Sequence, residues 1–215
     1  MNKIAVPYVA GLSSVSNTEL KTALVSQGNN YPVAEANWEQ LYPEKPECIV
    51  FLAHDSRNLH ALFLVKGYGL RAVNTANQSP VSQDSCVEIF LAPSVQGEYW
   101  NFEFNCIGGV NSSHRIIRPE PTRLTDDEIS QIRRLGSCGN KPFNEKEGYY
   151  EWDLLVSIPF SLLKLQGEIR GKIIKGNIYK CSSASIRPHY LSLFPIATPK
   201  PDFHRPDFFG DIELQ

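Results

Sequence analysis

The stretch YWNFEFNC, residues 99–106, alternates strictly between apolar and polar side chains. The apolar positions are Trp100, Phe102, Phe104 and Cys106, and the polar positions are Asn101, Glu103 and Asn105. Successive side chains of a β-strand point to opposite faces of the sheet. This period of two therefore predicts a strand with one face in a hydrophobic core and the other face accessible. The chain is expected to fold around such strands.

Further segments carry strand patterns. Residues 48–53 and 59–66 are apolar runs joined by HDSRN, which predicts a hairpin, and further strands are expected at 85–92, 152–158, 172–180, 189–196 and 209–215. Many short strands with Gly- and Pro-rich connections indicate a mostly β protein. We expect an antiparallel β-sandwich of jelly-roll or immunoglobulin-like type, with two or three short helices.

Capping-box spacing, Ser or Thr followed three residues later by Glu, marks the start of two predicted helices. The first helix begins at Ser16, and the second begins at Thr125 and is expected to run to near Gly136. A third, short helical turn is expected after Pro159, because proline suits the first position of a helix.

Length and charge narrow the possible functions. The 215 residues suit one domain, residues 1–215, and 42% hydrophobic content supports a sizeable core. A net charge of −2 without a basic cluster argues against nucleic acid as a partner. The longest apolar runs are far below the roughly 20 residues of a spanning helix, so no membrane insertion is expected. The residues carry no prediction of an oligomeric state.

The five cysteines are widely spaced, odd in number and form no CxxC pair. We expect them to be buried and reduced rather than a zinc site or a redox dithiol. The five histidines show neither HxH nor HExxH spacing, so no metal site or cofactor is predicted. Together with an N-terminal apolar stretch too short for a signal-peptide core, the cysteines favour a cytoplasmic over a periplasmic location.

Two glutamates stand out on neighbouring predicted strands. Glu88 interrupts the apolar run CVEIF, and a carboxylate there needs a partner such as a cation or a sugar hydroxyl. Glu103 lies on the polar side of the next strand. Paired carboxylates are the machinery of glycoside hydrolysis, so a glycoside hydrolase or lyase using both residues is one hypothesis. Its geometric test is whether the two side chains share a face of the sheet.

Several segments together resemble a known family. They are DSCVEIFLAP (84–93), YWNFEFNCIGG (99–109), EWDLLVSIPF (151–160), NIYKC (177–181), RPHYLSLFPI (187–196) and PDFHRPDFFGDIEL (201–214). From about residue 38 to the C-terminus, their order resembles carbohydrate-binding family 9-like proteins. These belong to the DOMON-like β-sandwich class and include single-domain members found in Bacteroides.

The resemblance implies non-catalytic binding of a saccharide in a cleft between aromatic side chains. Family 9 modules clamp the sugar between a tryptophan before the glutamate-bearing strand and an aromatic residue before the closing Phe-Gly strand. Glu88 matches the glutamate, Phe203 the second aromatic and Arg115 an arginine, whereas residues 74–83 contain no aromatic to match the tryptophan. The candidate saccharide-binding residues are Glu88, Asn105, Arg115, Phe203 and His204, with Arg71 and Lys180 as further candidates.

The resemblance leaves two matters open. Family 9 modules also bind structural calcium, but we assign no calcium ligands in this sequence. A domain that has lost its sugar site and serves in interactions is a third functional hypothesis. The segment PDFHRPDFFG bears on it, because Phe203 and His204 must face an open cleft to contact a sugar. Gly210 is expected to relieve backbone crowding where the last strand begins.

Overall fold

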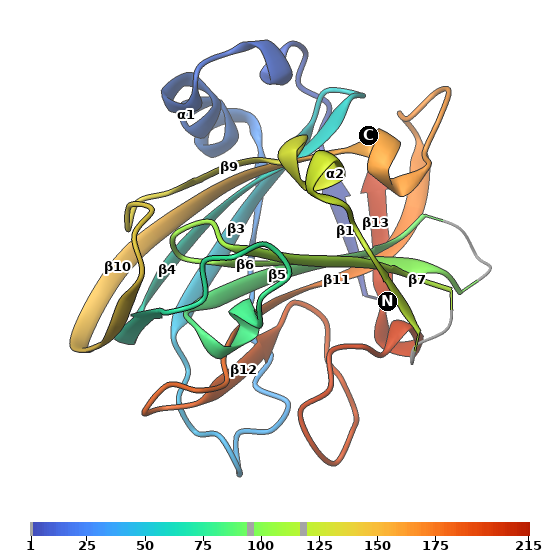
Figure 1. Ribbon diagram of the computed structural model, residues 1–215. Coiled ribbons are helices and arrows are strands. Elements are labelled where there is room, and N and C mark those ends of the chain that lie inside the picture. The colour runs from blue at the N-terminus through green and yellow to red at the C-terminus, as the bar shows by residue number, and fades with distance from the viewer. Residues whose placement is uncertain (1, 94–96, 117–119) are drawn as a thin grey trace.

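The computed structural model describes residues 2–93, 97–116 and 120–215, which form two packed β-sheets (Figure 1). The larger sheet has the order β1 (Lys3–Val6), β13 (Gly210–Leu214), β11 (Lys172–Ser182), β5 (Cys86–Ala92), β6 (Tyr99–Asn105), β7 (Val110–Arg115) and β8 (Pro121–Arg123), and β12 (His189–Ser192) pairs with β11. The smaller sheet has the order β2 (Asn29–Pro32), β3 (Glu47–His54), β4 (Asn58–Ala72), β10 (Phe143–Pro159) and β9 (Arg133–Gly136). Neighbouring strands are antiparallel except β1 and β13, which are parallel. The predicted antiparallel β-sandwich is confirmed.

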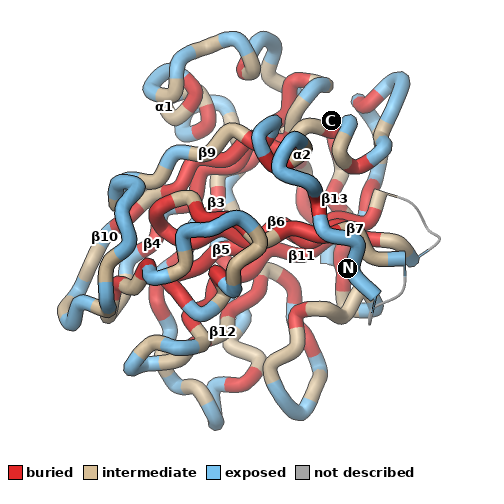
Figure 2. The backbone as a smooth tube through the Cα atoms, in the orientation of Figure 1, coloured by how far each residue is buried: buried red, intermediate tan, exposed pale blue. Residues whose placement is uncertain are grey.

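The main core lies between the sheets, where Figure 2 shows the strands buried. In the β5–β6 ladder, Ile89 is paired with Phe102 and Val87 with Phe104, and all four side chains are buried in this core. Trp152, on the facing sheet, belongs to the same core. The alternation in the sequence thus identified the inward side of these strands correctly.

The predicted hairpin at 48–66 is formed by β3 and β4. Its turn is organised by Asp55, whose carboxylate accepts hydrogen bonds from the backbone N–H groups of Arg57 and Asn58 at 3.1 and 3.0 Å. β4 continues to Ala72, beyond the predicted end, because β10 pairs with it as far as Phe143. The hairpin therefore forms the centre of the smaller sheet.

The helices are short and lie outside the core. α1 (Asn17–Gln27) has the predicted capping box at Ser16, and its buried leucines pack on the outer side of the smaller sheet. α2 (Asp126–Ser130) has a capping box at Thr125, but it ends six residues before Gly136. The predicted longer helix is wrong, because residues 133–136 extend and pair with β10 as strand β9. Short 3-10 turns complete the elements: η1 (Leu12–Ser14), η2 (Val81–Gln83), η3 (Phe160–Leu163), which begins after Pro159 as predicted, and η4 (Pro206–Phe208).

The other face of the larger sheet is also covered. A second apolar cluster there joins Phe90, Tyr99 and Tyr179 from the strands to Phe203 and Trp38 from two loops. As a result, the polar side of β6 is buried, with Asn101 and Asn105 0% and Glu103 5% exposed. The prediction of an accessible polar face on this strand is therefore wrong.

Among the helices of the described ranges, none is long and apolar enough to cross a membrane.

Candidate functional site

A pocket of about 200 Å³ opens on the outer face of the larger sheet. Its lining residues are Ser82, Glu88, Glu103, Cys181, Ser183, Tyr190, Pro201, Asp202, Phe203 and His204. Strands β5, β6 and β11 supply the floor, and η2, β12 and the loop at 201–204 supply the walls. Three of the residues predicted from the sequence, Glu88, Phe203 and His204, meet here.

A larger hollow of about 380 Å³ lies on the outer face of the smaller sheet. Partly exposed Ile49 and Leu64 line it, and an exposed ion pair joins Lys66 and Glu151 at 3.1 Å on its border. None of the predicted site residues lies there. Because the smaller pocket joins buried carboxyls, a thiol and aromatic rings, we regard it as the candidate site.

Two carboxyl groups form the floor of the pocket. Glu88 and Glu103 stand directly opposite each other on β5 and β6, so their side chains share one face of the sheet. Glu103 accepts hydrogen bonds from the amides of Asn111 and Asn101 at 2.9 and 3.0 Å. Burial raises the pKa of Glu103, although the hydrogen bond from Asn111 and the charge of Arg115 oppose the rise. Glu103 is thus a partly compensated buried carboxyl at the pocket floor.

Glu88 has a different environment. Its carboxyl group is 3% exposed and accepts hydrogen bonds from the thiols of Cys181 and Cys86 at 3.2 and 3.9 Å. Burial and then the neighbouring Cys181 and Glu103 raise the pKa of Glu88 well above its ordinary value. A thiol is only a weak donor, and among the described residues the hydrogen bonds to this carboxyl come from the two thiols.

The aromatic wall is built around Phe203. Its ring stacks on Tyr179 with a centroid distance of 4.1 Å and an interplanar angle of 9°, and Tyr190 approaches it edge-on at 6.1 Å. The Tyr179 hydroxyl also donates a hydrogen bond to the Phe203 carbonyl at 3.1 Å. Phe203 is only 9% exposed, so it both lines the pocket and anchors its loop to the sheet.

His204 is fixed by the same loop. Its Nδ1 lies 3.0 Å from the Tyr99 hydroxyl, and its ring packs 4.9 Å from Phe90. The backbone N–H of His204 donates to the Asp202 carboxylate at 3.2 Å. The imidazole is therefore held in one orientation at the pocket wall.

Arg115 lies one side chain away from the pocket. Its Nε donates to the Asn101 side chain at 3.2 Å, and Asn101 in turn donates to Glu103 at 3.0 Å. Arg115 thus acts on the pocket through Asn101 and through the charge that it presents to Glu103.

Asn105 and Arg71, which were also predicted as saccharide contacts, do not line this pocket. The Asn105 amide donates to Asp84 at 2.9 Å and to the Asn74 carbonyl at 2.6 Å, and its oxygen accepts from the Gly109 N–H at 2.7 Å. Arg71 Nε lies 3.4 Å from the Asp84 carboxylate. Both side chains hold the loop around Asp84.

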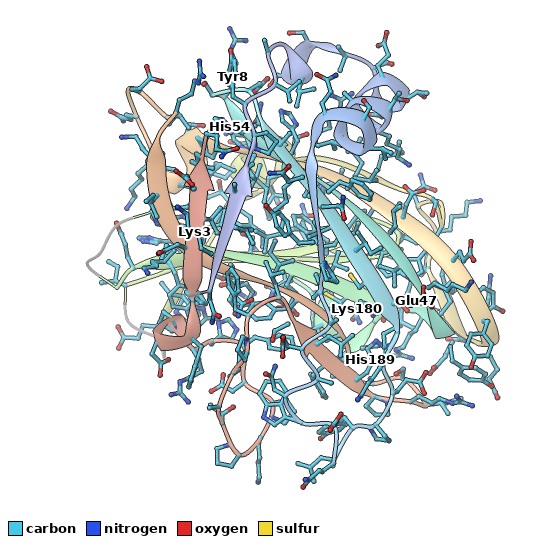
Figure 3. The ribbon with its side chains drawn as sticks, turned by 180° about the vertical axis from the view of Figure 1, so that it is seen from behind. Lys3, Tyr8, Glu47, His54, Lys180 and His189 are labelled. Atoms are coloured by element: carbon cyan, nitrogen blue, oxygen red, sulfur yellow. The ribbon has the colours of Figure 1, made fainter. Side chains whose placement is uncertain are left out.

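Lys180, also predicted as a saccharide contact, is on the face of the sheet opposite to the pocket. Its ammonium group is buried between the sheets, where Nζ donates to His189 Nε2 and to the Cys181 carbonyl, both at 2.8 Å (Figure 3). The side chain is 2% exposed. Neighbouring Cys181 points the other way and lines the pocket, because side chains alternate along a strand.

Sequence reasoning missed part of the wall. Tyr190 occupies the position between two buried inward residues of β12, His189 and Leu191, so the same alternation could have identified it. Ser82 lines the pocket just before β5, in the segment 74–83 that corresponds to the position of the tryptophan in family 9 modules. A serine in place of that ring leaves this wall polar.

Family 9 modules bind structural calcium, so we compared the ligands that calcium prefers with the cluster of possible metal ligands in the described part of the chain. That cluster consists of Cys86, Glu88 and Cys181. Calcium takes six to eight oxygen ligands, and two of these three side chains offer sulfur. The cluster therefore does not suit calcium.

The fold and the pocket define a β-sandwich module with a small polar and aromatic site on one sheet. The chain belongs to carbohydrate-binding family 9, whose model matches residues 20–214. The resemblance identified from the sequence is thus confirmed. No curated protein matched the chain.

Solved structures similar to this chain include the following three. A candidate carbohydrate-binding protein from Bacteroides uniformis is 30% identical, with 99% of each chain covered and a TM-score of 0.93. A family 9 module from Caldicellulosiruptor kristjanssonii in complex with glucose is 17% identical, with 99% of this chain and 95% of that chain covered and a TM-score of 0.56. The same kind of module from that organism in complex with cellotriose is 18% identical, covers 99% and 93%, and has a TM-score of 0.55. The last two share the fold.

Proposed function

We propose that the protein is a non-catalytic saccharide-binding module that holds one sugar ring in the pocket between β5, β6, β11 and the 201–204 loop. The observation that carries the proposal is the meeting of Glu88, Glu103, Phe203, His204 and Tyr190 around one opening. Membership of carbohydrate-binding family 9 supports it, as do family 9 modules solved with glucose and with cellotriose.

The lining suits the chemistry of a sugar. Carboxyl, hydroxyl and imidazole groups of Glu103, Asp202, Ser82, Ser183 and His204 can exchange hydrogen bonds with sugar hydroxyls. The edges of Tyr190 and Phe203 offer apolar contact for C–H groups. A volume of about 200 Å³ is below the roughly 300–1,000 Å³ of pockets for drug-sized ligands. One ring or the end of a chain is therefore the expected ligand.

Membership of carbohydrate-binding family 9, rather than the position of the two glutamates, favours binding over hydrolysis. Glycosidases place two carboxyl groups on either side of the scissile bond. Glu88 and Glu103 share a face on adjacent strands, which meets the geometric condition of the hydrolase hypothesis. Incubation with oligosaccharides and product analysis tests this reading, and release of shorter sugars that depends on Glu103 would overturn it.

Calorimetric titration with glucose, cellotriose and a panel of other mono- and oligosaccharides tests the proposed binding. We expect Glu103→Gln and Tyr190→Ala each to weaken the affinity by about tenfold or more, because each removes a contact in a desolvated site. Glu151→Gln is the matched control, since its carboxylate is 75% exposed on the other sheet. If the unmodified protein binds no member of the panel, the hypothesis of a lost sugar site replaces this proposal.

A further inference from the structure

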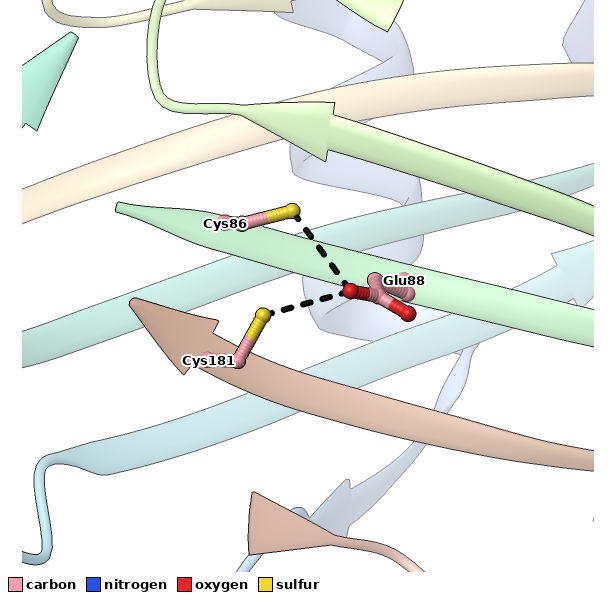
Figure 4. Close-up of side chains that lie close together, drawn as sticks. All are labelled: Cys86, Glu88 and Cys181. Atoms are coloured by element: carbon pink, nitrogen blue, oxygen red, sulfur yellow. Dashed lines mark hydrogen bonds between the residues drawn. The ribbon is translucent and has the colours of Figure 1, made fainter. Parts of the chain in front are cut away.

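The two thiols beside Glu88 come from different strands. Cys86 on β5 and Cys181 on β11 are directly paired in the antiparallel ladder, and Glu88 lies two residues further along β5 on the same face. Figure 4 shows both sulfur atoms directed at the same carboxyl oxygen of Glu88. The three ligand atoms all lie within 4.8 Å of one another. Three potential metal ligands therefore converge on one point.

The distances from the two sulfur atoms to the Glu88 oxygen are close to those in a tetrahedral metal site. With metal–sulfur bonds of about 2.3 Å and metal–oxygen bonds of about 2.1 Å, two ligands of a tetrahedral zinc ion lie about 3.5–3.8 Å apart. The Cys181 sulfur and the Glu88 oxygen are 3.2 Å apart, and the Cys86 sulfur is 3.9 Å from the same oxygen. A cation between these atoms requires only small side-chain movements.

The cluster is buried, and within the described ranges its carboxyl group has only weak hydrogen-bond donors. Cys86, Glu88 and Cys181 are 0%, 3% and 1% exposed, and the hydrogen bonds to the Glu88 carboxyl come from the two thiols within the described ranges. Buried carboxylates are usually paired with a positive charge or coordinate a metal. Lys180, which is next to Cys181 in the sequence, points to the other face of the sheet and bonds His189.

An entry path exists on one side. Glu88 and Cys181 line the pocket together with Ser82, Ser183 and His204, so an ion can reach them from solvent. Three protein ligands and an open side facing a pocket are the arrangement that zinc uses when it keeps one position for water or a ligand.

We infer that Cys86, Cys181 and Glu88 form a binding site for one thiophilic divalent cation, of the zinc class, at the floor of the pocket. Thiolates select zinc and similar soft or borderline ions over calcium and magnesium. The inference does not depend on saccharide binding, because the ligands, their spacing and their burial carry it. The sequence predicted no zinc site because the chain has no CxxC pair. Two cysteines that are far apart in the sequence can still share a metal when their strands are neighbours in the sheet.

The test is a titration of the purified full chain with Co²⁺ and then Zn²⁺, in the presence of a phosphine reductant. We expect one Co²⁺ per chain, with an intense thiolate-to-cobalt charge-transfer band and the visible bands of tetrahedral coordination, both removed by one equivalent of Zn²⁺. These signals report thiolate ligation in the unmodified protein, so the result does not depend on any variant folding. Absence of the charge-transfer band would overturn the inference.

Variants locate the site. Loss of a residue that only supports a metal ligand typically weakens metal binding by about 10–100-fold. Cys86 and Cys181 are proposed as direct ligands, so Cys86→Ser and Cys181→Ser are each expected to weaken Zn²⁺ binding by more than about 100-fold. Glu88→Gln is expected to weaken it while the cobalt–thiolate band remains. Cys138→Ser is the matched control, because Cys138 lies beside Cys106 in a separate thiol pair. A band that is lost in this control and kept in Cys86→Ser and Cys181→Ser would place the metal elsewhere and overturn the assignment.

Discussion

At the scale of single residues, Lys180 and His189 form a polar pair inside the sandwich. Lys180 donates to His189 Nε2, and the opposite nitrogen, Nδ1, lies 3.0 Å from the Arg187 carbonyl. This arrangement requires a neutral imidazole with its proton on Nδ1. Burial first, and the charge of Lys180 second, lower the pKa of His189 to about 2. The pair therefore makes stability depend on pH.

Between pH 6.5 and about 2, the unfolded chain binds a proton at His189 that the folded chain does not. The free energy of unfolding is therefore expected to fall as pH is lowered from 6.5, by up to about 1.4 kcal/mol per pH unit from this residue. We predict that His189→Gln, which keeps an acceptor for Lys180, shows a shallower loss of stability in urea unfolding between pH 7 and pH 4.5. At pH 8 the imidazole is neutral in both states, so the difference there reports only the changed packing. Equal slopes for both proteins would contradict the prediction.

Gly210 is a second residue whose role is local. A methyl group there would overlap the Phe194 ring and lie 2.6 Å from the Asn2 carbonyl oxygen, which agrees with the crowding expected from the sequence. We predict that Gly210→Ala lowers the free energy of unfolding by about 1–3 kcal/mol, as overpacking does in well-packed cores. Chemical denaturation measures it, with Asp211→Ala at the next, partly exposed position as the control. An unchanged midpoint for Gly210→Ala would show that the backbone moves freely here.

At the scale of elements, Asp84 and Asn105 join the turn after β6 to the segment after β4. Asp84 accepts hydrogen bonds from the N–H groups of Val73 and Asn74 at 3.0 and 2.9 Å and from the Asn105 amide at 2.9 Å. Asp84 and Asn105 are 0% exposed. Each bond therefore satisfies a group that water cannot reach.

We predict that Asn105→Ala destabilises the protein by about 2 kcal/mol or more, because it leaves buried acceptors and a buried N–H without their partner. The saccharide affinity of the folded variant is expected to equal that of the unmodified protein, since Asn105 is not among the residues that line the pocket. Urea unfolding and calorimetry measure the two effects separately, with exposed Asn140→Ala as the control. A selective loss of affinity at unchanged stability would return Asn105 to the binding site.

The same elements show what the sequence could predict. Alternation correctly placed Trp100 and Phe102 in the core, because a period of two is a property of the strand itself. It could not show that the outward side of β6 is covered, because the covering Phe203 comes from a loop about a hundred residues later. The pairing of Cys86 with Cys181 was equally hidden, since it depends on which strands become neighbours. Within the pocket, the resemblance identified Glu88, Phe203 and His204, and the spatial neighbours had to come from the structure.

At the scale of the whole molecule, the first and last strands of the chain pair with each other at one edge of the larger sheet. β1 pairs in parallel with β13, and Lys3 lies on this edge beside the last strand (Figure 3). The side chains of Ile4 and Val6 are 5% and 0% exposed and belong to the main core. The Val6 carbonyl accepts a hydrogen bond from the Gln215 N–H at 2.9 Å. β1 therefore belongs to the sandwich, although the family match begins at residue 20.

We predict that deleting residues 2–6 destabilises the whole domain and promotes self-association. The deletion removes two buried aliphatic side chains, each contributing about 1.5–3 kcal/mol, and exposes the edge of β13, whose backbone groups can then pair with another chain. Thermal unfolding is expected at lower temperature, and size-exclusion chromatography is expected to show larger species. Lys3→Ala is the control, because it removes only an exposed ion pair with Glu213 and keeps the strand. A deletion variant with the elution volume and thermal unfolding of the unmodified protein would show that β13 forms a stable edge without β1.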